Sequence, residues 1–255
     1  MITAGVDCGA KNVKVVVLKD GVVVGKAMAS AGMDTEAAVE KAFEAALEES
    51  GLSRDSIDKV VSTGAGKDEP QFVDDTVTDV GADARGMHHL YPEVRTVIDV
   101  GAEEGRAIRI DANGKVVDFA INEKCAAGAG AFTEAMARAL EVKVEEMGEL
   151  SLKSTQAIPM NAQCAVFAES EVISLVHRKT PKPDMARAIH DAIADRITSM
   201  VRRVGIEEKI ALTGGVAKNI GFVKSLKEDM ETDVIIPDEP DYTGAIGAAF
   251  VAADD

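Results

Sequence analysis

Tryptophan is absent from this 255-residue chain, and aromatic residues make up only 4% of it. Any core must therefore be built from aliphatic side chains. No apolar run approaches the roughly 20 residues that a helix needs to cross a bilayer. The chain also opens directly on a strand pattern, without the basic stretch and apolar run of a secretory leader. We therefore expect a protein that neither spans nor crosses a membrane.

Basic residues are scarce. Lys and Arg number 28 against 44 Asp and Glu, which gives a formal net charge of −16. Such a surface repels a phosphate backbone, so nucleic-acid binding is not expected. The same repulsion means that a bound nucleotide would need backbone N–H groups and a divalent cation to hold its phosphates.

Cysteine is also rare, with only Cys8, Cys125 and Cys164. This number is too small for a disulfide framework, and its being odd argues against one. We expect a reducing, cytoplasmic environment. Cys125 and Cys164 each precede a predicted helix, where the helix dipole would favour a metal-binding thiolate. Two cysteines cannot complete a four-cysteine cluster site, whereas a dimer with two from each subunit can. Spacing alone leaves open that both are buried and inert.

Hydrophobic residues, chiefly Ala, Val, Ile and Gly, are plentiful at 46%. Such a composition suits an α/β protein with helices packed closely on a sheet. Hydrophobic periodicity predicts helices over residues 34–50, 130–141, 165–178 and 244–253, and a long helix after the loop at 181–183. It predicts strands over 60–63, 209–213 and 233–236. The acidic run 141–149 is interpreted as a solvated helix face.

An internal repeat organises the chain. Residues 2–25 and 95–121 each contain an apolar strand, an Asp-x-Gly-Ala turn, a basic residue, a second strand, a glycine turn and a third strand. Asp7 aligns with Asp99, and Lys14 aligns with Arg106. Asp-Gly and Asn-Gly turns between apolar runs are typical of β-hairpins. The repeat predicts two similar halves with a cleft between them.

The two turns have the chemistry of a phosphate site. Gly9 and Gly101 allow close approach of backbone N–H groups to an anion. Asp7 and Asp99 are candidates to hold Mg²⁺, directly or through water. A third element, IALTGGVAKN at residues 210–219, leads from a strand through Gly-Gly into a helix start, where a nucleotide could lie. Taken alone, this third element is an ordinary tight turn.

Together with the C-terminal segment GAIGAA, these elements resemble the ATPase superfamily of actin, Hsp70 and the sugar kinases. The resemblance implies an α/β fold of two ribonuclease-H-like halves with ATP and Mg²⁺ between them. We place the first half at residues 1–92 and 240–255 and the second at 93–239. The residues expected to bind ATP or ADP are Gly9, Ala10, Lys11, Asn12, Gly101, Ala102, Gly214, Gly215, Val216, Lys218 and Asn219.

The cysteines carry a narrower resemblance. The segments KCAAGAGAF (124–132) and CAVFAESEVIS (164–174) resemble the ATPase family of 2-hydroxyacyl-CoA dehydratase activators and benzoyl-CoA reductase ATPase subunits, over nearly the whole chain. The resemblance implies that Cys125 and Cys164 hold a [4Fe–4S] cluster shared between two subunits. It also implies ATP-driven electron transfer from a reduced ferredoxin or flavodoxin to a CoA-thioester reductase or dehydratase.

The chain departs from that family pattern at both turns. The first carries Ala10 in place of a hydroxyl residue, and the second reads Gly-Ala-Glu-Glu rather than Gly-Gly-Gln-Asp. Glu103 stands at the glutamine position, where it would act as a base or repel the γ-phosphate. Ala102 adds a methyl group beside the phosphate.

A divergent copy fits one of two unequal subunits, so the sequence favours the smaller ATPase subunit of a benzoyl-CoA reductase in a heterodimer. A homodimeric dehydratase activator is the alternative. Two further alternatives are a small-molecule kinase of the same superfamily and a regulatory ATP-binding module whose cysteines are structural. Cys8, beside Asp7, is interpreted as a small residue tolerated in a tight turn.

Overall fold

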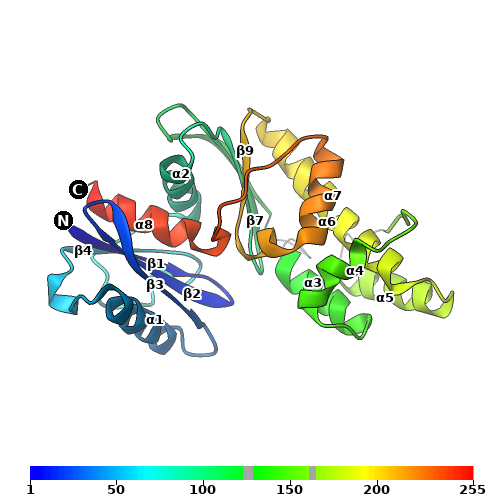
Figure 1. Ribbon diagram of the computed structural model, residues 1–255, viewed down its shortest axis with the longest axis horizontal. Helices are drawn as coiled ribbons and strands as arrows, with labels where there is room; N and C mark the ends of the chain where they lie inside the picture. The colour runs from blue at the N-terminus through cyan, green and yellow to red at the C-terminus, as the bar shows by residue number, and fades with distance from the viewer. Residues whose placement is uncertain (123–128, 161–164, 255) are drawn as a thin grey trace. The chain divides into compact units, whose positions relative to one another are not determined.

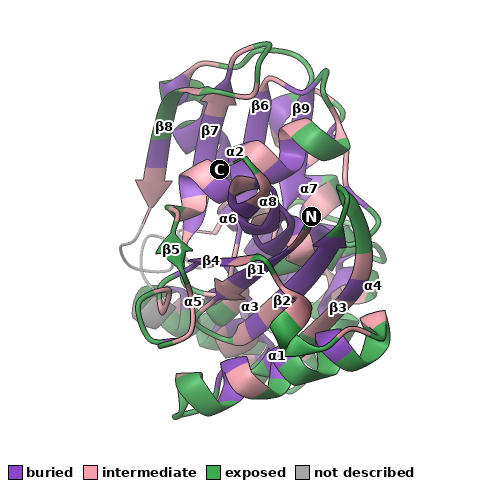
Figure 2. Cartoon of the chain, turned by 90° about the vertical axis from the view of Figure 1, so that its left-hand side faces the viewer, coloured by how far each residue is buried: buried purple, intermediate pink, exposed green. Residues whose placement is uncertain are grey.

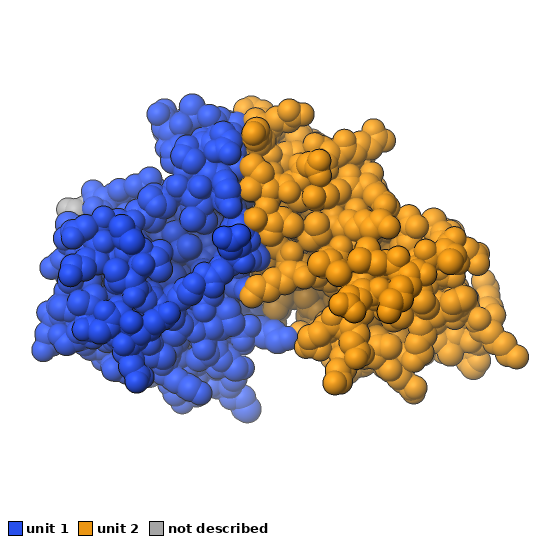
Figure 3. Space-filling view, in the orientation of Figure 1, with its two compact units in different colours: residues 1–97, 110–117, 237–255 blue, residues 98–109, 118–236 orange. Residues whose placement is uncertain are grey.

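The structure is a computed structural model that describes residues 1–122, 129–160 and 165–254. The chain forms two compact units, one of residues 1–97, 110–117 and 237–255 and the other of residues 98–109 and 118–236 (Figure 3). The two halves expected from the sequence, 1–92 with 240–255 and 93–239, stay a prediction.

The first unit is built on a five-stranded mixed sheet in the order β3-β2-β1-β4-β5. Helix α1 covers one face of this sheet, and α8 covers the other with α2 behind it (Figure 1). The elements are β1 (Ile2–Cys8), β2 (Asn12–Lys19), β3 (Val22–Ser30), α1 (Thr35–Ser50), β4 (Lys59–Thr63), β5 (Asp75–Thr76), α2 (Asp79–Leu90) and α8 (Thr243–Ala253).

Helix α1 shows how local sequence fixes these boundaries. Asp34 caps its N-terminus by accepting a hydrogen bond of 2.9 Å from the backbone N–H of Ala37. Gly51 ends the helix in the left-handed conformation, at φ 67°. Between the caps, Val39, Phe43 and Leu47 recur at helical spacing and pack on the sheet.

Helix α8 explains the glycine and alanine content of the C-terminal segment. A Cβ atom on Gly5 of β1 would lie 2.0 Å from the carbonyl oxygen of Ala245, and one on Gly247 would lie 1.8 Å from that of Ala82. The helix therefore touches both the sheet and α2 through bare backbone, which larger residues would prevent. Figure 2 shows α8 buried along nearly its whole length.

The second unit contains most of a four-stranded sheet in the order β8-β7-β6-β9, with a core of aliphatic side chains. Ile98, Ile189 and Leu212 lie in that core and are inaccessible to solvent. The elements are β6 (Thr96–Val100), β7 (Gly105–Ile110), β8 (Val116–Asn122), α3 (Ala129–Ala139), α4 (Met147–Ser151), α5 (Ala165–His177), α6 (Lys182–Val204), β9 (Ile210–Thr213) and α7 (Ile220–Met230).

Two predictions for the second unit were wrong. Residues 233–236 do not form a strand, because only Ile235 pairs, through a single parallel bridge to Ala211 of β9. The acidic run 141–149 is not a solvated helix. It contains a 3₁₀ turn at Val144–Glu146 and the start of α4, where Met147 and Gly148 are buried. The core needs an apolar contact there, and this requirement outweighs the charge of the neighbouring residues.

Candidate functional site

In the first unit, the Asp7 carboxylate is held by a cross-strand ion pair. Asp7 and Lys14 are direct partners in the antiparallel pairing of β1 with β2. The Lys14 ammonium donates to Oδ2 of Asp7 at 2.9 Å, and each side chain is only 16% exposed. The hairpin thus fixes the direction of the carboxylate at the end of β1.

Three glycines from separate segments surround this carboxylate. A Cβ atom would lie 2.8 Å from Asp7 Oδ1 if built on Gly64, 3.6 Å from Oδ1 on Gly9, and 3.6 Å from Oδ2 on Gly244. Gly64, which follows β4, has φ +93°. Backbone therefore approaches the Asp7 carboxylate closely at three points, as in turns that bind phosphate oxygens.

The remaining residues of the first turn lie at the surface. Ala10 and Lys11 are exposed, and Gly9 and Asn12 are half-buried. The carbonyl of Lys11 accepts a 2.9 Å hydrogen bond from the Ala31 N–H, which ties the turn to the segment after β3. The turn therefore has a fixed backbone.

The second unit repeats the ion pair. Arg106 donates to the Asp99 carboxylate at 2.6 Å and to the Glu104 carboxylate at 2.6 Å. Its side chain is 12% exposed and that of Asp99 is 9% exposed. In both units the basic residue follows its aspartate by the same spacing and reaches back across a tight turn. The duplicated sequence therefore produces a duplicated electrostatic arrangement.

The turn between these two residues is closed by backbone. The Gly101 N–H bonds the carbonyl of Glu104 at 2.9 Å. The carbonyls of Gly101 and Ala102 accept hydrogen bonds of 3.2 Å and 2.9 Å from the N–H groups of Gly130 and Ala131 at the start of α3. Glu103 is exposed at the tip of the turn. The second Asp-Gly turn and the first residues of α3 therefore form one hydrogen-bonded unit.

Gly214 faces Asp99 as Gly64 faces Asp7. It has φ +84°, and a Cβ atom on it would lie 2.4 Å from Asp99 Oδ1 and 2.5 Å from the Val100 carbonyl oxygen. The Gly-Gly element does not lead straight into a helix as predicted. Gly215–Lys218 form a 3₁₀ turn in which Gly215 and Lys218 are exposed and Val216 is buried. The helix α7 begins only at Ile220.

Asn219 caps that helix. Its side-chain oxygen accepts 3.1 Å hydrogen bonds from the N–H groups of both Gly221 and Phe222. The amide nitrogen then points to Nε2 of His190 on α6, 3.0 Å away. His190 is fully buried, and burial lowers its pKa to about 4, so the ring is neutral and Nε2 accepts. Asn219 therefore has a structural role in addition to any contact with a nucleotide.

Cys125 and Cys164, the predicted cluster ligands, lie outside the described residues. Cys8 is described and is buried. Burial, with a smaller contribution from Asp7, raises the pKa of its thiol to about 12, so it stays protonated. Within residues 1–122, 129–160 and 165–254, no group of three or more His, Cys, Asp or Glu side chains gathers as a metal site. In the same ranges no helix has the length and apolarity to span a membrane.

The Thr-Gly pairs at the ends of β4 and β9 were only half anticipated. The sequence identified Thr213-Gly214 as part of a nucleotide element but assigned no role to Thr63-Gly64. Both pairs follow a buried strand, and both glycines have positive φ and face an aspartate carboxylate. The repeated Thr-Gly after an apolar strand is the signal that could have identified the first pair.

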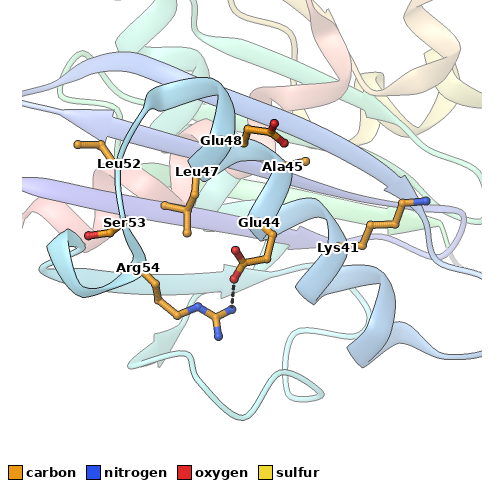
Figure 4. Close-up of a pocket in the computed structure, with 8 residues that line it drawn as sticks. All are labelled: Lys41, Glu44, Ala45, Leu47, Glu48, Leu52, Ser53 and Arg54. Carbon is orange, nitrogen blue, oxygen red and sulfur yellow. Dashed lines mark ion pairs between the residues drawn. The ribbon is translucent and has the colours of Figure 1, made fainter.

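A surface hollow of about 630 Å³ lies elsewhere on the first unit, along α1 and the segment that follows it (Figure 4). Lys41, Glu44 and Glu48 line it on one side, and Arg54 points toward Glu44 from the other. None of the residues expected to bind a nucleotide lines it, so it is not the candidate site.

The solved structures that share this architecture include two groups. A sugar-phosphorylating enzyme of the ROK family, a glucokinase from Streptomyces griseus, superimposes with a TM-score of 0.64 at 15% identity over 100% of both chains, which establishes the actin- and sugar-kinase-like α/β fold alone. The activator of the 2-hydroxyisocaproyl-CoA dehydratase from Clostridium difficile, solved with bound ADPNP, superimposes with a TM-score of 0.94 at 38% identity, covering 100% of this chain and 95% of that one.

Sequence comparison gives the same second group. The 2-hydroxyisocaproyl-CoA dehydratase activator of Clostridioides difficile is 38% identical, across 100% of this chain and 96% of its own length. The activator of lactoyl-CoA dehydratase from Anaerotignum propionicum is 38% identical, over 99% and 97% of the two chains. A benzoyl-CoA reductase subunit from Thauera aromatica is 35% identical, over 99% and 93%. Residues 4–252 match a single family model, and the chain belongs to the BadF/BadG/BcrA/BcrD ATPase family.

Proposed function

We propose that this protein is the ATP-dependent activator of a 2-hydroxyacyl-CoA dehydratase and works as a homodimer. The sequence alone favoured the smaller subunit of a benzoyl-CoA reductase. The comparisons favour the alternative, because two dehydratase activators are 38% identical to the chain and the reductase subunit is 35% identical. An activator solved with ADPNP supports nucleotide binding here.

The observation that carries the nucleotide site is the duplicated aspartate. Asp7 and Asp99 each end a strand, each is fixed by a basic residue, and each faces a glycine of positive φ. Each carboxylate is a donor that suits Mg²⁺, which prefers one or two carboxylates and keeps several waters. When bound, Mg²⁺ would neutralise phosphate charge and so lower its repulsion by a chain of net charge −16. The glycine N–H groups would bind the phosphates.

Hydrolysis would take place at the second turn. Glu103 is exposed and not held by the Arg106 ion pairs, which engage Asp99 and Glu104. In the proposed mechanism Glu103 orients the attacking water or accepts its proton. Gly9, Ala10, Lys11 and Asn12 would bind phosphate in the first unit. Gly101, Ala102, Gly214, Gly215, Val216, Lys218 and Asn219 would do so in the second.

Helix α3 would couple ATP hydrolysis at the second turn to the segment that holds Cys125. The carbonyls of Gly101 and Ala102 are hydrogen-bonded to the first turn of this helix, and the segment that holds Cys125 directly precedes it. A change at the second turn on hydrolysis would therefore shift the start of α3. A [4Fe–4S] cluster held by Cys125 and Cys164 of two subunits would supply the low-potential electron. Nucleotide can drive such a rearrangement only by binding one state better than the other.

The partners follow from this role. They are a second copy of the chain, a reduced ferredoxin or flavodoxin as donor, and a dehydratase acting on a CoA thioester. The acidic surface argues against nucleic acid. We place the protein in the cytoplasm, where the cysteines would stay reduced.

The test is an anaerobic assay with a strong reductant, Mg²⁺-ATP and a purified 2-hydroxyacyl-CoA dehydratase. The wild-type protein should activate the dehydratase, and Asp99→Asn should lower activation at least about tenfold. Asp111→Asn is the matched control, because Asp111 only organises the β7–β8 hairpin by accepting from the Asn113 and Lys115 N–H groups. Full activation of the dehydratase by Asp99→Asn would overturn the proposal. So would a wild-type protein that activates the core subunits of a benzoyl-CoA reductase but not the dehydratase.

A further inference from the structure

The hydroxyl of Thr63, the last residue of β4, is buried without a hydrogen-bond partner among the described residues. The residue is 1% exposed. More than about 90% of buried polar groups in proteins are hydrogen-bonded, because an unsatisfied one loses its hydration without compensation. The Thr63 hydroxyl is therefore available to a partner that is present in another state of the protein.

The register of the sheet places this hydroxyl beside Asp7. Thr63 and Asp7 are direct partners in the parallel pairing of β4 with β1. Paired residues of adjacent strands project to the same face of a sheet. Neighbours two residues earlier identify that face: Gly5 touches Ala245 and Ala249 of α8, and Val61 packs with Ala248 and Ala252. Asp7 and Thr63 thus lie on the α8 face.

The start of α8 and the residue after β4 both lie close to the Asp7 carboxylate. A Cβ atom built on Gly244, in the first turn of α8, would lie 3.6 Å from Asp7 Oδ2. One built on Gly64 would lie 2.8 Å from Asp7 Oδ1. Neither glycine brings a side chain to this end of the sheet. The N-terminus of α8, an 11-residue helix, also favours negative charge at this end of the sheet.

We propose that the Thr63 hydroxyl is a ligand-contacting group of the Asp7 site and hydrogen-bonds an oxygen of the bound, hydrated Mg²⁺-nucleotide. The inference rests on the proposed nucleotide-binding function and adds a residue that neither the sequence repeat nor the Gly-Gly element includes. Thr63 extends the site from the first Asp-Gly turn to the end of the neighbouring strand. In the complex the hydroxyl gains a partner that none of the described residues provides.

Two substitutions separate the hydroxyl from the shape of the side chain. Thr63→Val keeps the β-branched shape and removes the hydroxyl. Thr63→Ser keeps the hydroxyl and removes a methyl group. Thr198→Val is the matched control, since the Thr198 hydroxyl, on α6 in the second unit, is also 1% exposed and without a partner among the described residues. Because neither valine substitution breaks a hydrogen bond to any residue that the structure describes, both variants should fold.

The measurement is calorimetric titration of the full-length protein with Mg²⁺-ADPNP. Thr63→Val should bind about tenfold more weakly than wild type, the loss expected for one hydrogen bond to a charged ligand. Thr63→Ser and Thr198→Val should stay within about twofold. Unchanged affinity in Thr63→Val, while Asp7→Asn weakens binding, would overturn this inference alone. Absence of binding in wild type, or wild-type affinity in Asp7→Asn, would overturn the proposed nucleotide site together with it.

Discussion

Lys14 and Asp7 face each other across the first hairpin, and their ion pair of 2.9 Å has a counterpart of 2.6 Å between Arg106 and Asp99. The duplicated sequence therefore preserves a charge arrangement as well as a fold. In each unit the basic residue holds the carboxylate at the end of a strand, and a glycine of positive φ lies close beside that carboxylate.

Removing the cation of the first pair should destabilise the protein. Lys14→Met leaves the largely buried Asp7 carboxylate without its charged partner, at a cost of about 1–3 kcal/mol in the free energy of unfolding. Urea denaturation would measure it. Lys224→Met is the control, because Lys224 and its partner Glu228 are both about half exposed and such pairs contribute less than about 1 kcal/mol. Equal effects of the two substitutions would contradict the structural role of the Asp7–Lys14 pair.

The glycines that face the aspartates should tolerate no side chain. In Gly64→Ala the new methyl group would lie 2.6 Å from the Cys8 backbone, and in Gly214→Ala it would lie 2.4 Å from Asp99 Oδ1. Each should cost at least about 3 kcal/mol of stability, from steric overlap and positive φ together. Gly32→Ala separates the two causes, since Gly32 has φ +59° but open space around it. Its cost should be near 1 kcal/mol. A loss in Gly32→Ala as large as in the other two would mean that φ alone is responsible.

His190 should make stability depend on pH. Its folded pKa of about 4 lies below the ordinary value of 6.5, because burial disfavours the charged ring. As pH falls, His190 therefore binds a proton in the unfolded chain at a higher pH than it does in the folded protein. The stability is complete above pH 6.5 and declines toward pH 4, by about 3 kcal/mol in all from this residue. Denaturant unfolding across this range would show the slope.

The matching variant is His190→Leu, which should be less stable at pH 7 because Asn219 loses its acceptor, yet should vary less between pH 6.5 and 4. His177→Leu, at an exposed position on α5, should keep the wild-type slope. A His190→Leu slope equal to that of wild type would assign the pH dependence to other groups.

Two substitutions should distinguish the role of Asn219 as the cap of α7 from its proposed contact with the nucleotide. Asn219→Ala removes the cap of α7 and should cost about 1–2 kcal/mol in thermal or urea unfolding. Asn219→Ser keeps a capping oxygen, so it should recover most of that stability. Asn219→Ala should also weaken the binding of Mg²⁺-ADPNP. If Asn219→Ser restored that affinity, the cap alone would explain the contribution of Asn219 to binding. If affinity stayed low, the amide itself would contact the nucleotide.

The hairpins and their aspartates were predictable because each lies within one continuous segment. Asp7 with Lys14 and Asp99 with Arg106 show the repeat directly, and turn chemistry fixes the pairing of the strands. The role of Thr63 was not predictable, since it reaches Asp7 only through the parallel pairing of β4 with β1, and such pairing joins distant segments. The fold class predicted from the Asp-Gly turns and the C-terminal small-residue segment is confirmed by the solved relatives.

Errors arose where tertiary contacts outweigh local pattern. Residues 233–236 have strand propensity, but only Ile235 finds a partner. The helix expected directly after Gly215 is delayed to Ile220, because the chain first makes a 3₁₀ turn and then places Asn219 in an extended conformation to cap α7. The two glycines predict a turn, but the sequence pattern does not show that Asn219, which caps α7 after the turn, contacts His190 of another helix.

Iron and acid-labile sulfide in protein purified without oxygen test the electron-transfer account most directly, with native mass measured on the same samples. The account predicts a dimer that carries about four irons, with the iron lost in Cys125→Ser and in Cys164→Ser. Cys8→Ser is the control and should keep its iron, because Cys8 is buried beside Asp7 with a protonated thiol. A native dimer without iron, or full iron content in Cys125→Ser or Cys164→Ser, would contradict it.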